Sequence, residues 1–153
     1  LPESYLNAAL QRLGLLHCLV SLCLVPKKAT AATFQVLPDV QSLALHGIKF
    51  TQKLFDAFAR AFERGNIGEL AFHDCTFDKY STNLLQELLI QSRGDIELIL
   101  GRNVRFAGQN TVQVLSPLVD HLTMIDVRYC DLGSTVEANA FLDTASNACK
   151  VRF

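Results

Sequence analysis

Apolar residues recur along this chain with a fixed spacing that predicts a series of short, half-buried strands. Between Val40 and Phe50 they fall at offsets 0, 3, 5, 8 and 10. The segments that begin at Ile67 and Leu122 repeat those five offsets. Alternation at offsets 3 and 5 is typical of a strand that buries one side, because successive side chains point to opposite faces. Each of these segments is therefore predicted to contain one strand.

Two further segments follow the same pattern less closely. The segment that begins at Asp95 has a polar residue at offset 0, Leu98 and Leu100 at offsets 3 and 5, and Asn103 at offset 8, while Phe106 comes one position late. Ala148 opens a final copy that the end of the chain cuts off. The starts are 27, 28, 27 and 26 residues apart, at positions 40, 67, 95, 122 and 148. A regular period of this length indicates a repeat architecture.

Helical periodicity follows each of the first three predicted strands. Apolar residues three or four positions apart carry it: Leu54, Phe58, Phe62, Leu84, Leu85, Leu88, Leu89, Val114, Leu115 and Leu118. Gly65 and Gly94 are expected to end the first two helices, because glycine readily adopts the conformation that terminates a helix. Pro117 predicts that the third helix is short or kinked. A fourth helical segment, 136–148, carries few large apolar residues.

The first 39 residues depart from the repeat. Ser4 is expected to cap a helix that ends at Gly14. Strand-like spacing begins at Leu19, only 21 residues before the first full repeat. We interpret residues 1–39 as an N-terminal cap or an irregular first repeat, because an end repeat otherwise exposes half of its core. Residues 40–153 are expected to form one continuous domain that is truncated at its C-terminus.

These segments resemble the leucine-rich repeat family, whose units read Leu-x-x-Leu-x-Leu-x-x-(Asn or Cys)-x-Leu before a helix. Cys75, Asn103 and Cys130 at offset 8 resemble the ribonuclease-inhibitor-like or cysteine-containing classes. The resemblance covers residues 40–153 and departs at Ile48, which replaces the usual Asn or Cys. It implies an α/β solenoid with a parallel β-sheet on the concave face and helices on the convex face. The parallel strands would then run through Leu43, Leu70, Leu98 and Ile125.

Composition narrows the classes of partner and compartment. The 14 Lys and Arg residues balance 15 Asp and Glu residues, so the whole molecule has no bias toward nucleic acid or an anionic surface. No apolar run reaches the roughly 18 residues that a membrane-spanning helix needs, so no membrane is expected as a partner. Five cysteines are an odd number. They do not form the even framework of a small secreted domain, which indicates the cytoplasm or the nucleus.

No motif indicates catalysis, and the protein is not expected to be an enzyme. The sequence lacks a nucleophile elbow, a phosphate loop, a dinucleotide-binding glycine motif and HExxH. His17, Cys18 and Cys23, like His73 near Cys75, are metal-ligand residue types. They lack the paired spacing of zinc sites, so neither a metal nor another cofactor is expected.

Strand alternation places a second set of side chains on the opposite face from the core. In repeat proteins this face and its loops usually bind the partner. At offset 6 lies a predicted basic column, formed by His46, His73 and Arg128 with Arg102 beside it. A second predicted group is apolar and aromatic, formed by Ile99, Met124 and Tyr129. The column suits an acidic or phosphorylated segment of a partner, and the apolar group suits an anchoring pocket; ordinary solvated strand residues would have the same pattern.

The sequence therefore favours a protein–protein interaction module that binds a partner protein or peptide through the concave strand face and its adjacent loops. Such a module would be the recognition part of a larger adaptor or scaffold. One alternative is nucleic-acid binding through the basic column, although the neutral charge balance argues against it. A second alternative is self-assembly, in which the uncapped C-terminal edge forms a homo-oligomer.

Overall fold

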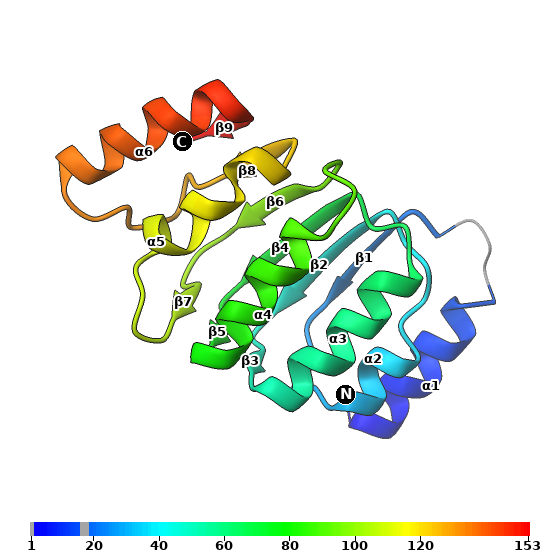
Figure 1. Cartoon of the computed structure of the whole chain (residues 1–153). Coiled ribbons are helices and arrows are strands. Elements are labelled where there is room, and N and C mark those ends of the chain that lie inside the picture. Colours follow the sequence, from blue (N-terminus) through cyan, green and yellow to red (C-terminus); the bar gives the residue numbers. More distant parts are fainter. Residues whose placement is uncertain (1, 16–18) are drawn as a thin grey trace.

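The computed structural model describes residues 2–15 and 19–153 and has an α/β architecture built on a six-stranded parallel sheet (Figure 1). Its strands are β1 (Ser21–Leu24), β2 (Ser42–His46), β4 (Glu69–His73), β6 (Glu97–Leu100), β8 (Met124–Asp126) and β9 (Lys150–Arg152). Each strand pairs with the one that precedes it along the chain, in the order β1-β2-β4-β6-β8-β9. The predicted α/β class with a parallel sheet is confirmed.

The strand register confirms the predicted ladder. Leu43 pairs with Leu70, Leu70 with Leu98, Leu98 with Ile125, and Ile125 with Val151. The first four of these side chains are 0% exposed. The regular spacing along the sequence has become a column of buried side chains across the sheet, and a slip of one residue would turn that column toward solvent.

Helices lie along one side of this sheet (Figure 1). They are α1 (Glu3–Leu13), α2 (Ala31–Gln35), α3 (Gln52–Arg64), α4 (Lys79–Ile90), α5 (Thr111–Leu115), the 3-10 helix η1 (Ser116–His121) and α6 (Thr135–Ala148). A smaller parallel sheet follows the main strands and consists of β3 (Lys49–Phe50), β5 (Thr76–Phe77) and β7 (Arg105–Phe106). Among the residues described, no helix is long and apolar enough to cross a membrane.

The core lies between the main sheet and the helices, and phenylalanines fill its centre. The largest fully buried rings come from α2, α3 and the strands: Phe34, Phe50, Phe55, Phe58, Phe72 and Phe77. Phe50 and Phe77 stack at 4.9 Å between ring centroids, and Phe77 stacks on Phe106 at 5.2 Å. The small sheet thus aligns one aromatic side chain from each of β3, β5 and β7.

Local side chains explain where several helices begin. The carboxylate of Asp78 accepts a hydrogen bond from the Ser81 N–H at 2.8 Å, which caps α4. Asn110 and Ser134 start α5 and α6 with capping boxes, in which the cap and the third helical residue satisfy each other's backbone N–H groups. These caps are local features that a sequence can encode without help from the rest of the fold.

Two predicted helix ends are wrong. The backbone carbonyl of Pro2 accepts hydrogen bonds from the N–H groups of Tyr5 and Leu6, so Pro2 and not Ser4 stands at the cap of α1. Helix α4 ends at Ile90, before Gly94, which adopts a left-handed φ of 77° in the following loop. The other expected ends hold, because Gly14 and Gly65 directly follow α1 and α3.

The third unit contains one extra residue, which corrects the predicted position of Asn103. Arg105 pairs with Thr76, so Val104 and not Asn103 stands level with Cys75. Asn103 instead adopts a left-handed φ of 57° and lies level with Asp74, whose φ is 51°. Its side-chain amide donates a hydrogen bond to the Asp74 carboxylate at 2.7 Å. The extra residue also explains why Phe106 came one position late in the sequence pattern.

Pro117 shortens the third helix as predicted. Helix α5 ends at Leu115, and η1 begins at Ser116 with the proline in its first turn. Proline has no N–H for a helix-interior hydrogen bond, but it is tolerated in the first turn, where that N–H would be unsatisfied. Leu118 of η1 is 0% exposed, so the short 3-10 segment still contributes to the core.

Candidate functional site

The helices leave the opposite face of the main sheet uncovered (Figure 1). Its side chains alternate with the buried ladder, and they are Ser42, Ala44, His46, Glu69, Ala71, His73, Glu97, Ile99, Met124, Asp126, Lys150 and Arg152. We call this surface the open face. Most of these residues are partly or fully exposed.

Both signs of charge lie at each end of the open face. Glu69 pairs in register with Glu97, and the Ser42 hydroxyl donates a hydrogen bond to the Glu69 carboxylate at 2.7 Å. Both glutamates lie at the first residues of their strands, level with Lys150 at the start of β9. The predicted basic column lies where the strands end, together with Asp126 at the end of β8.

The two histidines of the predicted basic column stack on each other. The rings of His46 and His73 are parallel within 14°, and their centroids are 4.4 Å apart. Burial lowers the pKa of His73, the neighbouring His46 lowers it further, and Asp74 opposes both effects only in part. A lowered pKa disfavours the charged form of His73, so this histidine contributes less positive charge to the predicted basic column than the sequence indicated.

Gly101 makes room for this histidine stack. Gly101 directly follows β6, level with His73 at the end of β4. The His73 ring lies directly over it. A Cβ atom at Gly101 would overlap the ring atoms of His73. The close approach is the physical reason for a glycine at this strand end.

Gly101→Ala is expected to force the His73 ring off the sheet and to break its stack on His46. The expected loss is about 0.5–1.5 kcal/mol in the free energy of unfolding, the scale of one aromatic pair. In a His73→Ala background the same substitution should cost nothing. Urea denaturation of the two single variants and the double variant measures the difference, and an equal cost in both backgrounds would contradict the contact.

Arg102 and Arg128 converge on one aromatic ring. The guanidinium carbon of Arg102 lies 5.2 Å from the centroid of the Tyr129 ring, and that of Arg128 lies 5.9 Å from it. Both distances are within the range of a cation–π interaction. Tyr129 is 53% exposed, so this group of two arginines and one tyrosine is accessible to a ligand.

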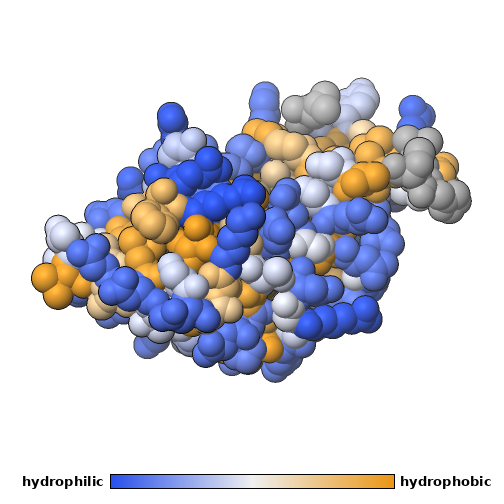
Figure 2. Space-filling model, turned by 90° about the horizontal axis from the view of Figure 1, so that it is seen from above, coloured by the Kyte–Doolittle hydropathy of each residue, from blue (hydrophilic) through white to orange (hydrophobic). Residues whose placement is uncertain are grey.

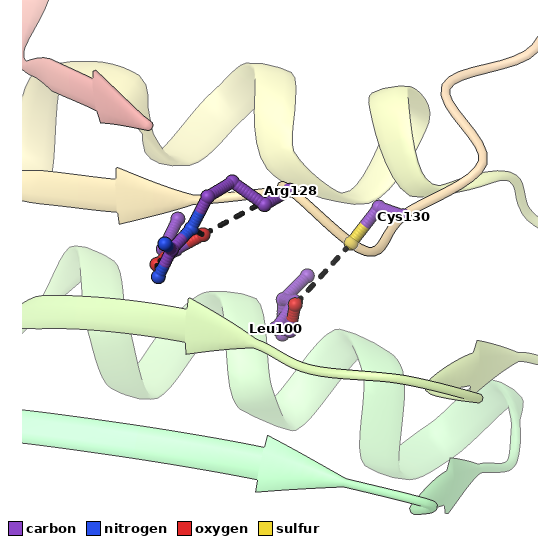
Figure 3. A network of polar contacts seen from close by, with 4 residues as sticks. Leu100, Arg128 and Cys130 are labelled. Carbon is purple, nitrogen blue, oxygen red and sulfur yellow. Dashed lines mark hydrogen bonds and ion pairs between the residues drawn. The ribbon is translucent and has the colours of Figure 1, made fainter. Parts of the chain in front are cut away.

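A buried carboxylate fixes the orientation of Arg128 (Figure 3). Asp126 is 1% exposed and accepts hydrogen bonds from Nε of Arg128 at 3.0 Å and from Nη2 at 2.7 Å. Burial opposes ionisation of this carboxyl, but the hydrogen bonds from the Arg128 side chain and backbone outweigh it and lower the pKa of Asp126. Asp126 is therefore ionised at neutral pH and holds Arg128 in place, a role that sequence reasoning did not assign to it.

One member of the predicted apolar group cannot act as an exposed anchor. Met124 is 1% exposed, and its in-register neighbours on the adjoining strands are the long side chains of Glu97 and Lys150. Ile99 remains half-buried on the open face. Tyr129 lies beside Arg102 and Arg128. Of the predicted apolar group, only Ile99 therefore remains as a partly exposed apolar side chain on the strands of the open face.

Cys75 and Cys130 occupy equivalent positions, as the repeat predicted. The Cys75 thiol donates to the backbone carbonyl of Leu45 at 3.4 Å, and the Cys130 thiol donates to that of Leu100 at 3.6 Å (Figure 3). Burial raises the pKa of both thiols, that of Cys130 to about 11. Both thiols stay protonated at neutral pH and act as packing groups, because the thiolate is the reactive form.

The metal-ligand residue types do not gather into a metal centre in the part of the chain that the structure describes. No group of three or more His, Cys, Asp or Glu residues lies close enough to hold an ion among residues 2–15 and 19–153. His17 and Cys18, which the sequence analysis named with Cys23, lie outside the described residues.

Hollows on the helix side lie away from the predicted binding residues. Seen from above, apolar side chains gather on the side of the molecule that carries the C-terminal elements (Figure 2). A groove of about 440 Å³ lies between α5, η1 and α6, and Val112, Val119 and Phe141 contribute its apolar walls. None of the residues on the open face lines this groove.

Asp126 and Gly101, which were not predicted as site residues, each have a signal in the sequence. Asp126 and Arg128 are two positions apart on one strand edge, the spacing that places both side chains on the same face. Gly101 stands where the preceding two units carry His46 and His73.

Comparison of the chain with protein-family models, curated proteins and solved structures found no match.

Proposed function

We propose that this protein is a leucine-rich-repeat interaction module that binds a partner protein or peptide on the open face, and that it is not an enzyme. The observation that carries the proposal is the division of the main sheet into two faces. One face is buried under helices through the ladder of Leu43, Leu70 and Leu98, and the other carries no helices and presents mostly partly exposed side chains in register.

The repeat assignment is supported by equivalent contacts in successive units. The left-handed positions Gly47, Asp74 and Asn103 follow three consecutive strands, and each turns the chain from the main sheet into the small sheet. The thiol contacts of Cys75 and Cys130 recur two units apart. Units of this kind bury their apolar edges only against one another, which leaves an extended surface for binding.

The N-terminal segment and the cysteines add two further points to the proposal. Strand β1 pairs with β2 in parallel, which supports the interpretation of the N-terminal segment as an irregular first repeat. Cys23, Cys75, Cys130 and Cys149 are free thiols. Unpaired thiols suit a reducing compartment, and we place the protein in the cytoplasm or the nucleus.

A matched pair of substitutions tests the binding face. Ile99→Arg puts a bulky charge on the open face, while Ile90→Arg makes the same change at the exposed end of α4 on the helix side. Proteins captured by the parent chain and identified by mass spectrometry should be lost with Ile99→Arg and retained with Ile90→Arg. Equal capture by all three proteins, each shown to be folded by circular dichroism, would contradict the proposal.

A further inference from the structure

We propose that Arg102 and Arg128, arranged around Tyr129, bind a phosphorylated side chain in a peptide segment of the partner. This inference rests on the partner-binding role proposed above and specifies the chemistry of the ligand. We call the three residues the arginine clamp. The clamp lies where the chain leaves the strands, at the end of the open face that carries the predicted basic column.

Both guanidinium groups have N–H donors available for an anion. Asp126 engages Arg128 through Nε and Nη2, which leaves Nη1 free, and the Arg128 side chain is 51% exposed. Arg102 is exposed and forms no ion pair with any residue in 2–15 or 19–153. Arginine presents its donors in a planar fork that matches phosphate oxygens in a bidentate arrangement.

The local charge balance favours an anion. Arg152 pairs in register with Asp126 and acts on its carboxylate. Asp74 beside Arg102 is a second carboxylate at this end of the sheet. The three guanidinium groups of Arg102, Arg128 and Arg152 exceed these two carboxylates by one positive charge. A phosphate monoester carries about −1.5 to −2 at pH 7, whereas a carboxylate carries only one negative charge. A phosphate therefore interacts more strongly with the two clamp guanidinium groups than Asp or Glu would.

The orientation of Arg128 supports binding over simple solvation. The buried Asp126 carboxylate holds the Arg128 guanidinium by hydrogen bonds from Nε and Nη2, and the guanidinium of Arg102 lies beside the same Tyr129 ring before a ligand arrives. Donors that are already oriented lose less conformational entropy when the anion binds.

The test uses three short, otherwise identical alanine-rich peptides that carry phosphoserine, glutamate or serine at the centre. Each is titrated into the isotope-labelled protein, and NMR follows the side-chain Nε–H signals of the arginines. The phosphoserine peptide should shift the signals of Arg102 and Arg128 in a saturable manner. Loss of one charge-assisted contact costs about tenfold in affinity, so Arg102→Gln and Arg128→Gln should each weaken binding by about that factor.

Arg60→Gln provides the matched control, because it removes the same charge from an exposed position on α3. It should leave phosphopeptide affinity unchanged. Equal affinity for the phosphoserine and glutamate peptides, or no saturable shift at either clamp arginine, would overturn the proposal. So would a single-stranded oligothymidine that binds the clamp more tightly than the phosphopeptide. Any of these results leaves the Ile99→Arg capture experiment intact, so failure of the clamp is distinguishable from failure of the partner-binding role.

Discussion

Phe50→Ala is expected to lower the free energy of unfolding by about 3–5 kcal/mol, the typical range for deleting a buried aromatic ring. Phe50 is 1% exposed, and its ring contacts five others: Phe34, Phe55, Phe58, Phe72 and Phe77. Those rings come from α2, α3, β4 and β5, so they cannot all move inward to fill the space. The remaining cavity adds to the lost burial. Urea denaturation followed by circular dichroism measures the change.

Two controls separate the loss of packing from the loss of a phenylalanine as such. Phe50→Leu keeps most of the buried volume and should be far less destabilising than alanine. Phe153→Ala removes the same ring from a side chain that is 74% exposed, and it should alter stability by no more than about 0.5 kcal/mol. If Phe50→Ala and Phe153→Ala had equal effects, the aromatic cluster would not be the centre of the core.

Leu70→Ala is expected to cost about 2–5 kcal/mol. Leu70 lies on the central strand β4, is 0% exposed, and pairs in register with Leu43 on one side and Leu98 on the other. A cavity there removes contacts from both neighbouring units at once. The midpoint of urea denaturation should fall without a change in cooperativity if the units unfold together.

The matched control is Leu15→Ala, the same truncation at a side chain that is 75% exposed. Its denaturation curve should overlay that of the parent within about 0.5 kcal/mol. If Leu70→Ala also denatured like the parent, the ladder would not be the buried column described above.

The strands were predictable because their information is local and repeated. When an apolar position recurs about every 27 residues, each unit can bury that side chain by packing against the equivalent side chain of the next unit across a sheet. The register of Leu43 against Leu70 followed from that argument alone. Helix ends were less predictable, since the cap of α1 depends on which backbone carbonyl, that of Pro2, accepts the first N–H groups.

The candidate site was predictable only in part. Outward alternation correctly grouped His46 with His73, because neighbours in register share a face. Arg102 was placed beside the column only by its position next to Gly101, and the Tyr129 ring is what brings it near Arg128. Alternation did not capture the electrostatics of His73. The charge on His73 depends on burial and on the stacked neighbour, and both are properties of the assembled sheet.

The sequence by itself determined the period, the strand register and which side chains lie on the face opposite the core, because side-chain alternation and repeat spacing are properties of the chain. Only the tertiary structure decided which polar groups are charged, buried or oriented. Asp126 is a buried positioning group for Arg128, and Met124 on the same face is 1% exposed. Desolvation and hydrogen-bond geometry depend on which side chains of the neighbouring strands surround a polar group. Those neighbours are determined only when the strands assemble into the sheet.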